Sequence, residues 1–174
     1  DMSKAKLKKL LKEMPKDEVI NLVMELYDAK KEAKEYLEYY LEPDECAMLE
    51  SYRRIIKEEF YPTKTLWEPK TRFSVCRKAI SDFSKLKPAP ENMAELMVSY
   101  MEYATQFTFD YGDMWEQYYD AVERNFERTL KFVTVHALLP AFRLRLHQCV
   151  LWSKHCGWGF EDAMTDLYDE YCAK

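Results

Sequence analysis

The sequence predicts an all-α protein, and three observations point to this fold class. Only three glycines occur among the 174 residues, whereas glycine usually makes up about 7% of a protein. Apolar residues recur three and four positions apart along most of the chain, which is the spacing of one helix face. No stretch alternates apolar and polar residues as a half-buried strand does. We therefore expect about eight or nine short helices in antiparallel hairpins, arranged as a helical bundle or a short HEAT-like superhelix.

The first quarter of the chain predicts three helices. Pro15 ends the first one, whose lysines form a solvated face beside a stripe of leucines. Asp17 and Glu18 favour the start of the second, because acidic side chains stabilise the positive end of a helix dipole. The apolar spacing weakens over residues 28–32 and resumes over residues 33–41, where we expect the third helix.

The next boundaries depend on proline. Pro43 predicts the start of a helix that runs to about Tyr61. Residues 62–73 contain two prolines and no apolar period, so we expect a loop there, followed by a helix that Ser74 caps. This loop is the main internal break in what we expect to be a single all-helical domain over residues 1–174.

A long helix should follow the hinge at residues 87–90. Pro90 suits its first turn, and Gly112 suits its end. Asp113 and Glu116 then have the spacing of a capping box, which predicts that they open the next helix.

Two helices are expected in the last part of the chain. Pro140 opens the first, and Gly157 is expected to stop it. Gly159 lets the chain turn before a final helix over residues 160–171, which has acidic residues in its first turn.

Cysteine use and hydropathy indicate a cytoplasmic chain. The five cysteines are scattered and odd in number, which argues against a disulfide framework. No apolar run approaches the roughly 18 residues of a membrane span, so we expect no membrane association. The first residues do not follow the basic and then apolar pattern of a leader, so we expect none. Asp1 precedes Met2, and we expect the native chain to begin at Met2, with Asp1 an added residue.

The formal net charge of −5 is unevenly distributed. Residues 1–88 contain 19 Lys and Arg and 17 Asp and Glu, whereas residues 89–174 contain 7 and 14. The acidic half disfavours extensive contact with nucleic acid. The basic first half keeps a nucleic-acid accessory role open as an alternative.

The spacing of His, Cys and Gly excludes several site types. Structural zinc needs close Cys or His pairs, and a di-metal carboxylate bundle needs Glu-x-x-His. Neither pattern occurs, and no glycine-rich phosphate loop occurs either. We therefore expect no metal and no cofactor, and we assign no catalytic residue.

One predicted helix has an acidic face. Its acids recur at alternating spacings of three and four: Asp113, Glu116, Asp120, Glu123 and Glu127. They would form a contact surface for a basic partner or a loosely held divalent cation. Helix capping and surface pairing of Asp120 with Arg124 also explain them without any ligand.

The aromatic residues mostly follow the apolar stripes and are expected in the core. Trp67 in the loop and Trp158 and Phe160 in the last corner are the exceptions. Together with nearby acids they define an expected binding surface: Asp113, Glu116, Asp120, Trp158, Phe160, Asp162 and Asp166.

These features favour a non-catalytic binding or scaffold protein whose helices present a groove to a protein or peptide. The alternative is an enzyme with a carboxylate-lined cleft near the corners at residues 110–116 and 157–166. In that case general acid and base groups would come from four acids: Asp113, Glu116, Asp162 and Asp166. The oligomeric state stays open.

Four segments resemble a family of unknown function. The longest reads LKKLLKEMPKDEVINLVMELYDAKKEAKEYLEYYLEPDE, over residues 7–45, and the closing one reads GWGFEDAMTDLYDEY, over residues 157–171. RKAISDF and FTFDYGDMWEQYYDAVERNFERTLK lie between them in the same order. The chain is thus similar to an all-helical bacterial domain-of-unknown-function family. The resemblance implies a single-domain cytoplasmic protein and no activity.

Overall fold

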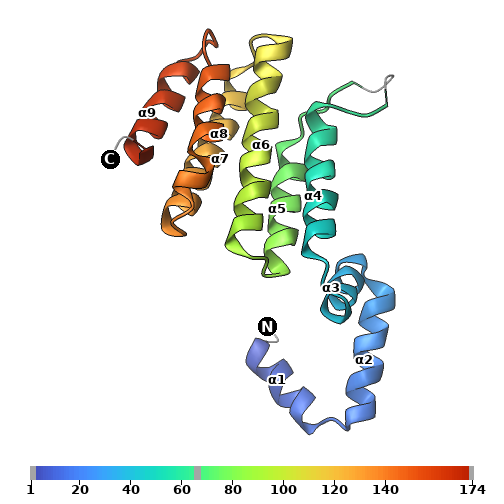
Figure 1. Ribbon diagram of the computed structural model, residues 1–174. Coiled ribbons are helices and arrows are strands. Elements are labelled where there is room, and N and C mark those ends of the chain that lie inside the picture. The colour runs from blue at the N-terminus through green and yellow to red at the C-terminus, as the bar shows by residue number, and fades with distance from the viewer. Residues whose placement is uncertain (1–2, 65–67, 173–174) are drawn as a thin grey trace. The chain divides into compact units, whose positions relative to one another are not determined.

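The computed structural model describes residues 3–64 and 68–172, which form nine α-helices and no strand (Figure 1). The prediction of an all-α fold is therefore confirmed. The helices are α1 (Lys4–Glu13), α2 (Lys16–Ala29), α3 (Lys31–Leu41), α4 (Glu45–Phe60), α5 (Phe73–Lys85), α6 (Pro90–Tyr111), α7 (Glu116–Val135), α8 (Leu139–Trp152) and α9 (Phe160–Cys172).

The chain divides into two compact units, residues 1–44 and residues 45–174. The loop at residues 62–73, which we expected to be the main internal break, lies within the second unit. That residues 1–174 act as a single domain stays a prediction. Asp1 and Trp67 lie outside the described residues.

The first unit contains α1, α2 and α3, and none of their residues is buried. Tyr27 of α2 donates a hydrogen bond to Glu38 of α3 over 2.8 Å, which joins the two helices. Many large apolar side chains remain exposed: Leu7, Leu10, Ile20, Leu22, Val23, Met24, Leu26, Tyr36, Tyr40 and Leu41. Uncovered apolar surface of this extent is typical of a segment that contacts a partner.

The second unit contains α4 to α9 and the hydrophobic core. Each of these helices packs against its neighbour along the chain, and α4, α6 and α8 also pack against one another in that order, as do α7 and α9. Contacts between helices one and two apart are typical of stacked helical hairpins. All six helices contribute to the largest fully buried side chains, and most of these are aromatic or aliphatic. They are Tyr100, Tyr118, Tyr119, Phe60, Phe83, Phe126, Phe160, Ile56, Leu96, Met101, Leu130 and Leu146.

Several helix boundaries follow the sequence prediction. Pro90 lies in the first turn of α6, and Pro140 lies in the first turn of α8. Gly112 ends α6 with φ of +96°, a conformation that glycine adopts without the steric cost of a side chain.

The predicted cap at Ser74 is wrong, because α5 begins one residue earlier, at Phe73. The buried carboxylate of Glu59 holds the chain at this point. It accepts hydrogen bonds from the backbone N–H of Arg72 (3.0 Å) and from two nitrogens of its guanidinium (3.0 and 2.7 Å). This ion pair joins α4 to Arg72, the residue that directly precedes α5.

The prediction that Gly157 stops α8 is also wrong. The helix ends at Trp152, with Ser153 as the capping residue. The Ser153 hydroxyl donates to the carbonyl of Val150 (2.7 Å), and its N–H donates to the carbonyl of Cys149 (3.2 Å). The last carbonyls of the helix are thus satisfied without a glycine.

A charged network joins α4, α6 and α8. The guanidinium of Arg145 donates to Glu102 (2.8 and 2.6 Å) and to Glu95 (2.5 Å). Arg53 of α4 donates to the other oxygen of Glu95 (2.8 Å). Burial raises the pKa of Glu95, but Arg145 and Arg53 outweigh burial and hold that pKa below its ordinary value.

We expect Arg145→Ala to lower the free energy of unfolding by about 2 kcal/mol, because two half-buried carboxylates lose their shared cation. Urea denaturation at neutral pH measures this loss. Arg54→Ala is the matched control, since Arg54 is an exposed arginine outside the network. A loss no larger than that of the control would contradict the structural role of the network.

The loss of unfolding free energy in Arg145→Ala should depend on pH. The pKa of Glu95 is lower in the folded chain than in the unfolded chain, so its charged form stabilises the fold at neutral pH. This stabilisation is lost as the pH falls through the folded pKa. The difference between the native chain and Arg145→Ala should therefore narrow below about pH 4.

Candidate functional site

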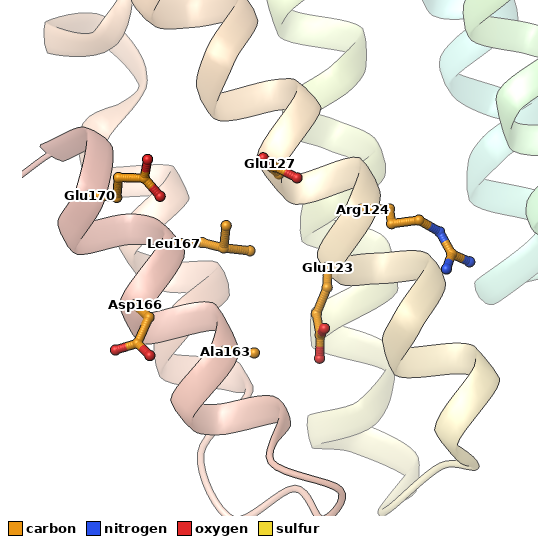
Figure 2. Close-up of a pocket in the computed structure, with 7 residues that line it drawn as sticks. All are labelled: Glu123, Arg124, Glu127, Ala163, Asp166, Leu167 and Glu170. Atoms are coloured by element: carbon orange, nitrogen blue, oxygen red, sulfur yellow. The ribbon is translucent and has the colours of Figure 1, made fainter.

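A groove of about 370 Å³ lies between α7 and α9 (Figure 2). Its lining side chains come only from these two helices: Glu123, Arg124, Glu127, Ala163, Asp166, Leu167 and Glu170. Spacings of three and four residues place each set on one face of its own helix. Ala163 and Leu167 are half-buried and supply the apolar part of the lining.

The charge in the groove is negative. Glu123 and Glu127 lie on α7, and Asp166 and Glu170 lie on the facing part of α9. Among the described residues, no lysine or arginine forms an ion pair with these four carboxylates. The expected pairing of Asp120 with Arg124 is not found among them either. The groove therefore presents acidic groups that form no ion pair among the described residues.

Glu123 is the most enclosed of these acids, since the other three are exposed. Burial raises its pKa above the ordinary value, and the neighbouring charge of Asp120 raises it further. Arg124 opposes this shift, but its side chain extends away from α9 in Figure 2. A nearby cation would lower the pKa of Glu123.

Aromatic packing holds α9 against α7 beside the groove. The ring of Phe160 stacks on that of Tyr119, with centroids 4.3 Å apart and planes 23° apart. Phe160 and Met164 of α9 are fully buried. Phe160 is therefore a core residue and does not belong to the expected binding surface.

The carboxylate of Asp113 joins the two corners that flank these helices. Its Oδ1 accepts hydrogen bonds from the N–H of Gly157 (3.0 Å), the N–H of Met114 (3.1 Å) and the Tyr119 hydroxyl. The bond from Tyr119 is the main cause that lowers the pKa of Asp113 below its ordinary value, and the bond from Gly157 lowers it further. The corners at residues 110–116 and 157–166 thus come together.

The predicted capping box of Asp113 and Glu116 is wrong. Helix α7 begins at Glu116, with Trp115 in the capping position and no side-chain capping hydrogen bond. Asp113 accepts from the N–H of Gly157 in the other corner and from the side chain of Tyr119, but from no backbone N–H of α7. Gly157 makes this possible, because a Cβ there would lie 2.8 Å from Oδ2 of Asp113.

The remaining residues of the expected surface are distributed around the groove. Asp166 lines it, whereas Glu116, Asp120 and Asp162 are exposed outside its lining. Trp158 is 66% exposed and adopts a φ of +59°. Of the acids in this expected surface, Asp166 lines the groove, where it faces Glu123 and Glu127 of the predicted acidic face.

The acidic face predicted from the sequence includes Glu123 and Glu127, but no role at a site was predicted for Ala163, Leu167 or Glu170. The sequence did contain a signal for Glu170. Asp166 and Glu170 are four residues apart, as are Glu123 and Glu127, so each helix carries two acids on one face. Nothing in the linear sequence indicates that those two faces meet.

Comparison with known protein families shows which family the chain belongs to. Residues 2–171 match a family of unknown function, DUF6155. The chain belongs to the DUF6155 family. No curated protein and no solved structure matches it.

Two further properties of this DUF6155 chain bear on the site. Within residues 3–64 and 68–172, no helix has both the length and the apolar character needed to cross a membrane. In the same residues, no three or more His, Cys, Asp or Glu side chains are grouped so that they could hold a metal ion.

The close approach of Gly157 to Asp113 gives a test of the corner. We expect Gly157→Ala to lower the free energy of unfolding by about 1 to 2 kcal/mol, since the added methyl group displaces the carboxylate. Gly159→Asn is the control, because Gly159 has open space around it and asparagine tolerates its φ of +73°. Urea denaturation of both variants gives the comparison, and equal stability would contradict a tight corner.

Proposed function

We propose that this protein is a non-catalytic binding protein, and that the groove between α7 and α9 holds a basic amphipathic helix or peptide of a protein partner. The observation that carries the proposal is the unpaired acidic lining. Four carboxylates surround a partly apolar groove, and Arg124 is the only cation in its lining among residues 3–64 and 68–172. A cationic and apolar ligand complements both properties.

The two acid pairs support a helical ligand. An apolar stripe on such a helix would contact Leu167 and Ala163, and lysines beside the stripe would reach the carboxylates of α7 and α9. Complementary charge of this kind accelerates association and selects the partner. The excess of acidic residues in the second half of the chain would add to the attraction.

The cellular setting is part of the proposal. We propose a bacterial protein that acts in the cytoplasm. All five cysteines are free thiols, and three of them are buried. This arrangement suits a reducing compartment, in which disulfides do not persist.

A synthetic peptide of leucine and lysine at helical spacing provides a defined probe. We expect it to bind the protein and the affinity to fall as salt is raised, because the attraction is largely ionic. The double variant Glu127→Lys, Glu170→Lys should weaken binding about tenfold or more. Fluorescence anisotropy of the labelled peptide measures both effects.

The matched control is Glu68→Lys, Asp169→Lys. It changes the net charge by the same amount at exposed acids that do not line the groove. If the control weakens binding as much as the groove variant does, the attraction is a general charge effect and the groove is not the site. Absence of binding by the monomeric protein would reject the proposal directly.

A further inference from the structure

Helix α1 carries the features that the groove requires of a ligand. Between Lys4 and Glu13 it contains five lysines and a single acidic residue. Leu7 and Leu10 lie on its apolar face with 41% and 50% of their surface exposed. No residue of α1 is buried, so the helix has an apolar stripe and a dense positive charge that are both uncovered.

The spacing of the charges also matches. Lys4, Lys8 and Lys12 are four residues apart, which corresponds to a rise of about 6 Å along a helix. Each of the two acid pairs of the groove, one on α7 and one on α9, has the same four-residue spacing. A helix that lies along the groove can therefore place Lys4 and Lys8 beside two successive carboxylates, while Lys12 lies farther from the apolar stripe.

The leucines of α1 can contact the apolar floor of the groove when the helix lies along it. Leu7, Leu10 and Leu11 follow the three- and four-residue spacing of one helix face. Lysines flank this stripe, with Lys4 on one side of it and Lys6 on the other. The leucines would then contact Leu167 and Ala163, while the lysines on either side contact the acids of α7 and α9.

We infer that the groove between α7 and α9 receives α1 of a second copy of the chain. This inference rests on the proposed function and names the partner. Because each copy carries both α1 and the groove, two copies can exchange helices and form two identical contacts. Such an arrangement closes as a twofold symmetric dimer and leaves neither groove empty.

The first measurement is the mass of the full chain by light scattering after size-exclusion chromatography. We expect a dimer at about 50 mM salt that dissociates as salt rises to about 500 mM, because ionic contacts are screened. A monomer at both salt concentrations overturns the inference.

Charge reversal then tests which surfaces meet. One variant, Lys4→Glu with Lys8→Glu and Lys12→Glu, gives α1 a negative face. A second variant, Glu127→Lys with Asp166→Lys and Glu170→Lys, gives the groove a positive lining. Each variant alone should be monomeric, with dimer affinity reduced about tenfold or more, since like charges then face each other.

An equimolar mixture of the two variants should form a heterodimer. The acidic α1 of the first variant then enters the basic groove of the second, and the basic α1 of the second enters the acidic groove of the first. This rescue requires contact between two chains. A mixture that remains monomeric, or single variants that remain dimeric, overturns the inference.

Two controls complete the experiment. Lys16→Glu with Lys30→Glu reverses exposed lysines outside α1 and should leave the dimer intact. Circular dichroism should show native helix content in every variant. If the groove binds the leucine–lysine peptide while the chain remains monomeric, self-association is wrong and the proposed function stands. If neither occurs, both fail.

Discussion

The candidate site depends on the carboxylate of Asp113. By accepting hydrogen bonds from Tyr119 and from the backbone of Gly157, it joins the start of α7 to the corner that precedes α9. The stacked rings of Tyr119 and Phe160 then fix α9 beside α7. Because one end of the helix pair is held in this way, the acidic faces of the two helices line a common groove.

Among the described residues of the second unit, arginines form ion pairs with the acids between α4, α6 and α8 but not with the acids of the groove. Arg53, Arg72 and Arg145 form ion pairs with Glu59, Glu95 and Glu102, which stabilise the stacking of α4, α6 and α8 and the end of the loop before α5. The groove acids have no such partners among the described residues. The paired acids support the fold, whereas the proposed function depends on the acids around the apolar floor of the groove.

The first unit, residues 1–44, leaves apolar surface exposed. Its three helices bury no residue, although each has an apolar face. Burial of apolar surface is the main favourable contribution to folding, so such faces are most stable when they are covered. Helix α1 adds positive charge to an apolar stripe, and the groove combines negative charge with an apolar floor. The proposed exchange of α1 between two copies would cover both surfaces.

Helical spacing, the prolines at residues 90 and 140 and the glycine at residue 112 by themselves determined the fold class and most helix boundaries, because these signals act through the local backbone. The predicted caps at Ser74 and Asp113 were wrong, since contacts distant in sequence, from Arg72 to Glu59 and from Gly157 to Asp113, form at these boundaries instead. The predicted stop at Gly157 was wrong because Ser153 already caps α8 through local hydrogen bonds. The acids of α7 and α9 were visible as separate patterns. Only the tertiary structure decided that they share a groove and that Phe160 is buried, because packing brings together faces separated by about 40 residues.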